Sequence, residues 1–178
     1  MINEKVIIAG FGGQGVMLMG QLLSYAATDK DLNTLWFPSY GPETRGGTAN
    51  CSVTISETYV NSPVISTPDS IIIMNKPSLN KFQPKLKKGG HLFLNSSLVK
   101  DVEVREDVNV HNIAANDIAK RLGNVKVANM VILGAYLEIT KVFTEEEVLN
   151  ILKQKFTGSK ANLIEINKKA LEAGRKAL

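Results

Sequence analysis

The residues with the clearest chemical potential lie near the start of the chain, where residues 10–15 read Gly-Phe-Gly-Gly-Gln-Gly. Gly10, Gly12 and Gly15 match the spacing G-x-G-x-x-G, between a short apolar run and a helical pattern. Glycines permit positive φ and close approach, and the free N–H groups of a following helix favour an anion. The pattern predicts a strand, a glycine turn and a helix whose junction can bind an anion or pack closely against another backbone.

The next strand does not complete a dinucleotide site. In a nucleotide-binding βαβ unit, an acidic residue about 20 residues beyond the glycines ends the second strand and binds the ribose hydroxyls. The second apolar run here, residues 34–38, is followed by Ser-Tyr-Gly, whereas Asp29 and Asp31 come before it. The glycine spacing therefore favours an independent NAD- or FAD-dependent oxidoreductase, but the missing acid opposes it. A turn that needs its glycines only for packing is a further alternative.

A second stretch of interest is residues 39–47, SYGPETRGG, which is rich in turn formers and lies between two predicted strands. Loops beside a glycine turn at the strand ends of an α/β sheet commonly build binding sites. The alternative is a long polar loop in which Glu43 and Arg45 form a solvated pair.

Other signatures of catalysis are absent from the sequence. It contains no G-x-S-x-G elbow, no G-x-x-x-x-G-K-[ST] phosphate loop and no recognisable pair of catalytic carboxylates. His91 and His111 are remote from each other in sequence and have no Cys or carboxylate at ligand spacing, so they are predicted to be ordinary surface or strand-end residues. The single cysteine, Cys51, excludes an intrachain disulfide and cannot supply the thiolates of a zinc or iron–sulfur site. It is predicted to lie in the core.

The composition predicts one globular domain spanning residues 1–178. A chain of 178 residues can bury about 70% of its unfolded surface, enough for a hydrophobic core. The net charge of +4 comes from scattered lysines without interleaved aromatic residues, which disfavours nucleic acid. Neither a run of 18 apolar residues nor a signal-peptide pattern is present, so we expect a cytoplasmic chain without a membrane span.

Hydrophobic periodicity supplies the elements that would position these stretches. The predicted strands are residues 6–9, 34–38, 49–55, 71–74 and 91–94, with shorter candidates at 102–104 and 108–110. The predicted helices are residues 16–27, 77–82, 113–122, 129–140, 144–156 and 159–178, the fifth opened by a capping box at Thr144. The alternation in residues 49–55 indicates an edge or antiparallel strand. We therefore predict an α/β fold with three layers, a mostly parallel or mixed sheet, helices on both faces and a Rossmann-like start.

Taken together, the two stretches resemble the gamma subunit of 2-oxoacid:ferredoxin (acceptor) oxidoreductases. The resemblance is carried by residues 10–17, GFGGQGVM, and residues 37–51, FPSYGPETRGGTANC. It is strongest from residue 5 to about residue 96 and extends more loosely to the C-terminus. Within the family, the residues of these two stretches are more similar to those of the 2-oxoglutarate and 2-oxoisovalerate types than to those of the pyruvate type.

The resemblance implies a role in a larger enzyme. That enzyme oxidises a 2-oxoacid, here 2-oxoglutarate, with coenzyme A (CoA) to an acyl-CoA and carbon dioxide. Thiamine diphosphate, Mg and iron–sulfur clusters would be held by alpha, beta and ferredoxin-like delta subunits, with ferredoxin or a similar acceptor receiving the electrons. This chain alone would bind none of these cofactors, and the isolated chain would be inactive and could self-associate.

The resemblance also implies a site. It would complete the active-site region or the CoA path, and its residues would be Gly12, Gly13, Gln14, Gly15, Tyr40, Glu43, Thr44 and Arg45. Arg45 would pair with a phosphate or a partner carboxylate. A purely architectural subunit, whose glycine turn contacts only protein, remains the alternative.

Overall fold

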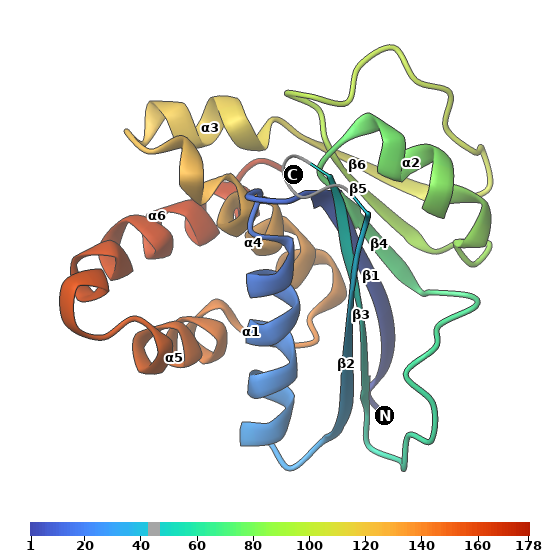
Figure 1. The fold of residues 1–178 in the computed structure, drawn as a ribbon, viewed down its shortest axis with the longest axis horizontal. Helices are drawn as coiled ribbons and strands as arrows, with labels where there is room; N and C mark the ends of the chain where they lie inside the picture. Colours follow the sequence, from blue (N-terminus) through green and yellow to red (C-terminus); the bar gives the residue numbers. More distant parts are fainter. Residues whose placement is uncertain (43–46) are drawn as a thin grey trace.

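A computed structural model describes residues 1–42 and 47–178 as a mixed sheet with helices packed on it (Figure 1). The strands are β1 (Asn3–Phe11), β2 (Asn33–Tyr40), β3 (Thr48–Ser56), β4 (Ser70–Ile73), β5 (His91–Asn95) and β6 (Asn109–Ile113). The α-helices are α1 (Val16–Asp29), α2 (Lys76–Phe82), α3 (Ala115–Arg121), α4 (Ala128–Thr140), α5 (Glu145–Lys155) and α6 (Ile164–Arg175). Short 3₁₀ helices are η1 (Gln83–Lys85), η2 (Val125–Val127) and η3 (Gly158–Leu163).

The sheet has six strands in the order β2-β3-β1-β4-β5-β6. β1, β4, β5 and β6 are parallel, and β3 is antiparallel to both of its neighbours. This confirms the predicted mixed sheet and the antiparallel strand at residues 49–55. Because β3 lies between β1 and β2, the β1–α1–β2 unit does not bring neighbouring strands together as a dinucleotide-binding unit does.

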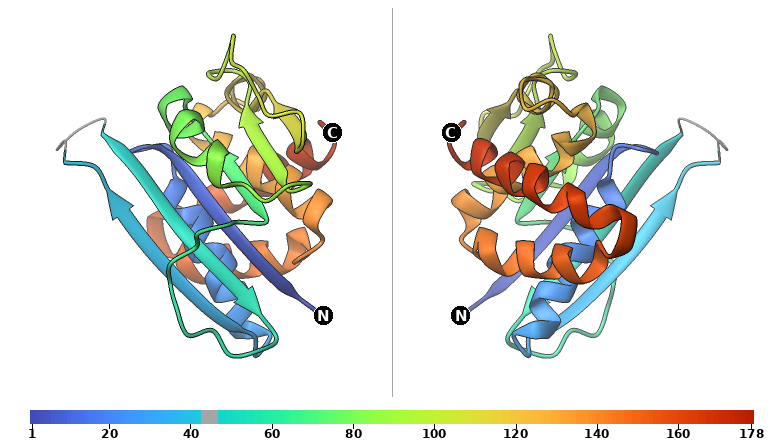
Figure 2. Two further views of the ribbon diagram at one scale, coloured as in Figure 1. Left: turned by 90° about the vertical axis from the view of Figure 1, so that its right-hand side faces the viewer. Right: turned by 90° about the vertical axis from the view of Figure 1, so that its left-hand side faces the viewer.

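Helices lie on both faces of the sheet, as predicted (Figures 1 and 2). The larger core cluster joins one face to α1 and α3–α6, and a smaller cluster joins the other face to α2. Over β2 and β3, however, the α2 side carries partly exposed residues, including Asn50, Ser52 and a half-exposed Phe37. β2 is the edge strand on this side, and it contains Pro38.

Two glycines allow α4 and α6 to pack closely. A Cβ at Gly134 would overlap the Leu171 carbonyl, and a Cβ at Gly174 would overlap the Val131 carbonyl. The two helix backbones therefore touch directly, which sets the depth at which α6 sits on the core.

The capping box that opens α5 is confirmed. The Glu147 N–H donates to the Thr144 hydroxyl at 3.2 Å, and the Thr144 N–H donates to the Glu147 carboxylate at 2.8 Å. Glu147 also accepts from Lys30 at 2.7 Å, so this cap ties α5 to α1.

Three predictions about helices and strands were wrong. Residues 102–104 form no strand, because a side chain satisfies this backbone: Gln83 donates to the Glu103 carbonyl at 3.3 Å and accepts from the Arg105 N–H at 2.8 Å. Ile113 ends β6 rather than opening a helix, and α3 begins two residues later. The predicted final helix is divided into η3 and α6.

Candidate functional site

The glycine turn lies between the end of β1 and the start of α1, as the sequence predicts. Gly13 has φ 91° and Gly15 has φ 74°, a region that L side chains rarely adopt. The Gly12 N–H donates to the Gly47 carbonyl at 2.9 Å, which joins the turn to the end of the second predicted stretch. Tyr40, which precedes that loop, is 70% exposed. The other predicted site residues of the loop, Glu43, Thr44 and Arg45, lie outside the described residues.

Gln14 holds the turn in place. Its side-chain oxygen accepts from the Phe11 N–H at 2.7 Å, and its amide nitrogen donates to the Met74 carbonyl at 3.3 Å. The side chain thus connects the last residue of β1 with the residue that follows β4. These bonds make Gln14 a positioning residue of the turn.

Asn129, at the start of α4, is a supporting residue that the sequence did not reveal. Its amide nitrogen donates to the Gly15 carbonyl at 3.3 Å, and its amide oxygen accepts from the Met130 N–H at 2.9 Å. A Cβ at Gly15 would overlap this side chain. Gly15 is therefore required both by its φ and by Asn129, which stands 114 residues away in the sequence.

A small cavity of about 170 Å³ opens beside the turn. Its lining includes Gly13, Gln14 and Met74 together with Asn116 and Lys126. The cavity lies where the chain leaves β1 for a helix on one face and leaves β4 for a helix on the other. Such a switch point at the carboxyl ends of parallel strands is where open α/β sheets bind ligands. Lys126 forms no ion pair with any described residue, so the cavity has a cation available for an anionic group. Neither Asn116 nor Lys126 belongs to a motif that sequence reasoning could have found.

The two histidines, which the sequence predicts to be surface or strand-end residues, are brought together on β5 and β6. His91 Nδ1 and His111 Nε2 are 3.1 Å apart, and Phe93 stacks on His111 with 4.7 Å between ring centroids. Burial lowers the pKa of both rings. His91 is the first residue of β5, so it lies at the amino end of the parallel strands, whereas the glycine turn lies at their carboxyl end. The histidine pair is therefore not part of the candidate site.

Glu4, on β1, is a carboxyl group with an unusual environment. Burial, reinforced by nearby Asp69, raises its pKa from 4.5 to about 7. The hydroxyl of the fully buried Tyr136 donates to it at 3.2 Å. Near neutral pH the Glu4 side chain is thus partly protonated.

Substituting Glu4→Gln should remove a pH dependence of stability. Because the folded pKa lies above the ordinary one, the stability that the bound proton contributes is present below pH 4.5 and is lost as the pH rises towards 7. We expect the free energy of unfolding of the variant to exceed that of the original chain by about 2–3 kcal/mol at pH 8. At pH 4.5 the two free energies should differ little. Urea titrations across this range measure the difference, and an equal difference at every pH would contradict the shift.

Cys51 is fully buried among α1 and β2 residues. Its thiol donates to the Val16 carbonyl at 3.6 Å, and burial raises its pKa to about 12. A Cβ at Gly20 would lie 2.5 Å from its sulfur. A thiol held protonated in the core is a poor metal ligand. Within residues 1–42 and 47–178, no group of three or more His, Cys, Asp or Glu side chains is arranged to hold a metal ion.

Cys51 should be a reporter of unfolding. In the folded chain we expect a thiol reagent such as dithionitrobenzoate to react more slowly than in denaturant by a factor of at least about 10³, because reaction requires opening of the core. Absorbance at constant reagent concentration measures the rate. Rapid reaction of one thiol in the native chain would contradict the burial.

Comparison with known proteins places this geometry in a family. The sequence model described as pyruvate ferredoxin/flavodoxin oxidoreductase matches residues 5–177. The chain is 40% identical over 171 residues to the ketoisovalerate oxidoreductase subunit VorA of Methanothermobacter marburgensis, covering 96% of this chain and 35% of that protein. It is 32% identical over 184 residues to the 2-oxoglutarate synthase subunit KorC of Methanothermobacter thermautotrophicus, covering 99% of this chain and 96% of that protein.

A solved structure has the same fold along nearly its whole length. It is the gamma subunit of a keto/oxoacid ferredoxin oxidoreductase from Geobacter sulfurreducens, with a TM-score of 0.82, 27% identity, and coverage of 98% of this chain and 97% of that one. The chain thus spans about a third of the VorA relative but nearly all of the KorC relative and of this gamma subunit. The family match over residues 5–177 confirms the resemblance seen in the sequence, and the chain belongs to the pyruvate ferredoxin/flavodoxin oxidoreductase family.

Proposed function

We propose that this chain is the gamma component of a multisubunit 2-oxoacid:ferredoxin oxidoreductase and that its glycine turn serves the active-site region completed by partner subunits. The observation that carries this proposal is the bare surface at Gly12. Among the described residues, a Cβ there would meet only the Gly47 carbonyl oxygen, at 3.8 Å, and Gly12 does not have a positive φ. Nothing among the described residues requires glycine at this position, which suits a surface that CoA or a partner backbone approaches closely.

The surroundings of the turn support contact with an anion or with protein. Phe11 and Tyr40 are exposed, and Lys126 lines the adjacent cavity. Exposed aromatic side chains are typical of interfaces, and a cation that pairs with no carboxylate of the described residues suits a phosphate or carboxylate. In this proposal, Glu43, Thr44 and Arg45 belong to the same functional site as the turn, and Arg45 pairs with a CoA phosphate or a partner carboxylate.

The cofactors of the reaction are proposed to lie in other subunits. An iron–sulfur cluster needs several cysteine thiolates, and this chain has one cysteine, buried and protonated, so its residues do not fit a cluster. Thiamine diphosphate, Mg and the clusters are therefore assigned to alpha, beta and ferredoxin-like delta subunits, with CoA as co-substrate and ferredoxin or a similar protein as acceptor. A cytoplasmic location is part of this proposal, since a lone thiol suits a reducing compartment. None of the described helices is long and apolar enough to cross a bilayer.

The substrate is proposed to be 2-oxoglutarate, oxidised with CoA to an acyl-CoA and carbon dioxide. The KorC relative, which this chain matches over almost its whole length, supports this choice. The higher identity to the VorA relative favours 2-oxoisovalerate as the second candidate. Comparing the two acids at equal concentration, with CoA and a viologen dye, separates them: a kcat/KM at least about tenfold higher for one acid, or 1.4 kcal/mol in transition-state binding, assigns the substrate.

The isolated chain should be catalytically silent. It has no suitable cluster ligands, and the proposed role needs partner subunits. We expect no dye reduction above background with either acid, CoA, thiamine diphosphate and Mg, and turnover once the alpha, beta and delta subunits are added. Turnover by this chain alone would contradict the proposed role, as would a complex whose activity does not change when this chain is omitted.

Two alternatives differ in what they bind. An independent nucleotide-dependent enzyme should bind NAD or FAD when either is titrated into the isolated chain; the lack of an acid at the end of β2 and the position of β3 oppose it. A purely architectural subunit should assemble with its partners but tolerate any side chain at Gly12 that leaves assembly intact.

A further inference from the structure

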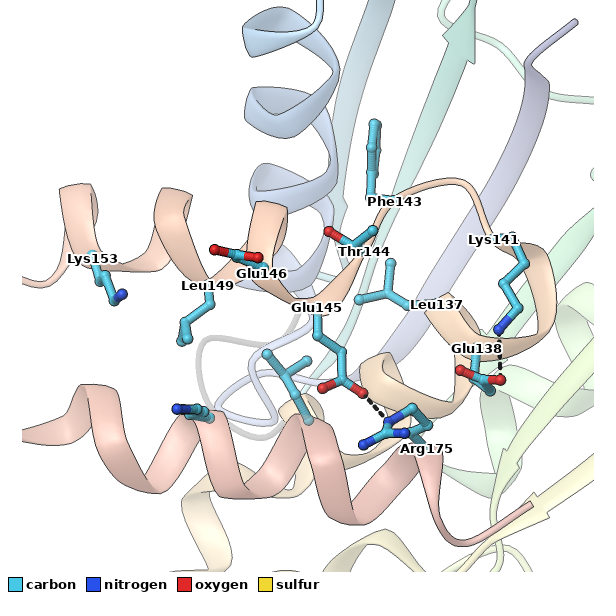
Figure 3. A pocket seen from close by; sticks show the side chains of 12 residues that line it. Leu137, Glu138, Lys141, Phe143, Thr144, Glu145, Glu146, Leu149, Lys153 and Arg175 are labelled. Carbon is cyan, nitrogen blue, oxygen red and sulfur yellow. Dashed lines mark hydrogen bonds and ion pairs between the residues drawn. The ribbon is translucent and has the colours of Figure 1, made fainter.

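A second and larger cavity lies between the end of α4, the following turn, α5 and α6 (Figure 3). Its volume is about 630 Å³, within the roughly 300–1,000 Å³ of small-molecule sites. It shares no lining residue with the cavity beside the glycine turn. The proposed function therefore makes no use of it.

The lining includes four large apolar side chains. Leu137 comes from α4, Phe143 from the turn after it, Leu149 from α5 and Leu171 from α6. Each is less than a tenth exposed. An apolar group that entered the cavity would therefore meet a surface of packed hydrocarbon.

The two helices that form its long sides face each other in antiparallel order. Glu145, at the start of α5, accepts from Arg175, at the end of α6, at 2.8 Å (Figure 3). One helical turn further along each helix come Leu149 and Leu171, which also line the cavity. From this end, the groove is lined first by the ion pair and then by the two leucines.

The next turn brings a pair of like charges. Lys153 follows Leu149 by four residues on α5, and Lys168 precedes Leu171 by three on α6; both line the cavity and both are exposed. Neither forms an ion pair with a described residue. Two ammonium groups facing one groove without a carboxylate between them repel each other.

The carboxylates of this region are paired with other cations, distant, or outside the cavity. Glu165, three residues before Lys168 on α6, is exposed and is not among the lining residues. Glu138 binds Lys141, and Glu172, one turn from Lys168, binds Lys176 at 2.8 Å. Glu146 also lines the cavity, but it lies two turns from Lys153, about 10 Å along the helix axis. The lysine end of the groove therefore keeps a local positive charge.

We propose that this cavity binds a small aliphatic carboxylate, with its hydrocarbon chain on the leucine surface and its carboxylate between Lys153 and Lys168. The anion would supply the charge that the lysine pair lacks, and the chain would extend towards Leu149 and Leu171. Charge at one end and hydrocarbon along the rest distinguish this ligand class from CoA or a free phosphate.

The test is titration of the full chain with octanoate, followed by calorimetry and by the melting temperature. We expect saturable one-to-one binding and a rising melting temperature. Lys153→Glu should weaken octanoate binding by at least about tenfold, because the new carboxylate repels the ligand. The melting temperature of the Lys153→Glu variant without ligand should not fall, since the introduced carboxylate faces Lys168. Lys169→Glu, the same change at an exposed lysine that does not line the cavity, should leave binding within about twofold.

Three results would overturn the proposal. One is absence of saturation by octanoate, and another is equal binding of octylammonium, which has the same chain and the opposite charge. The third is loss of octanoate binding when the chain is assembled with its partner subunits, which would assign the groove to a partner's acidic segment. Retained binding in the complex supports the proposal.

Discussion

Gly174→Ala should destabilise the chain strongly, although alanine is the better helix former. Propensity alone predicts a gain of about 1 kcal/mol in an α-helix interior. The added Cβ, however, would overlap the Val131 carbonyl oxygen of α4 and approach the Ala135 nitrogen at 3.2 Å. Since backbone atoms cannot rotate away, α6 must lift from the core and uncover part of Ala170 and Leu171. We expect a loss of at least about 3 kcal/mol, and for Gly174→Val no folded state at all, because total stabilities are about 5–15 kcal/mol.

Urea unfolding followed by circular dichroism measures this effect. Gly134→Ala should behave in the same way, since its Cβ would overlap the Leu171 carbonyl. Ala173→Gly is the matched control: it changes a neighbouring position of α6 without adding atoms and should cost only about 1 kcal/mol. A stabilised Gly174→Ala protein would show that the two helices are further apart than described.

Gly12→Leu should separate the stability of this chain from the activity of the complex. The side chain would extend from a position where a Cβ has one neighbour within 4 Å among residues 1–42 and 47–178, so the isolated chain should keep its free energy of unfolding within about 0.5 kcal/mol. In the reconstituted complex the same side chain would occupy the surface proposed to receive CoA or a partner. We expect kcat/KM to fall by at least about 100-fold, or 2.7 kcal/mol.

Concentration series identify which contact is lost: extra CoA restores activity in one case and extra subunit in the other. Gly13→Ala is the contrasting variant, because its φ of 91° makes it costly in the isolated chain, by about 1 kcal/mol, although space is open around it. Arg45→Ala tests the neighbouring loop, and the proposal expects lower activity of the complex with unchanged melting of the isolated chain. Full activity of the Gly12→Leu and Arg45→Ala complexes would reduce the turn to an architectural role.

Local patterns were sufficient to predict the parts of the fold whose causes are local. The box at Thr144 and Glu147 spans four residues, and the glycine turn reads directly from its neighbours, so both were found. The period of two in residues 49–55 predicted the antiparallel β3 for the same reason. The strand at residues 102–104 was wrongly predicted because its apolar alternation is satisfied against the smaller core cluster, with Gln83 taking the role of a neighbouring strand.

The sequence predicted some residues of the candidate site and missed others. The glycines of the turn and Tyr40 stand in recognisable motifs. Asn129 and Lys126 reach the turn only because α4 packs beside α1, and a contact between residues more than 100 positions apart leaves no local pattern. The histidine pair was missed in the same way, since parallel β5 and β6 place together residues that the chain separates by 20 positions.

The proline in β2 has a consequence for how copies of this chain can meet. A free strand edge offers a row of N–H and C=O groups to which another chain can add a strand, which is a common route to uncontrolled aggregation. Pro38 has no N–H, so that row is interrupted near the end of β2, and a strand approaching from another molecule would lack a donor there. Addition of a strand at this edge is thereby disfavoured, which leaves the faces of the sheet as the surfaces for contact between copies.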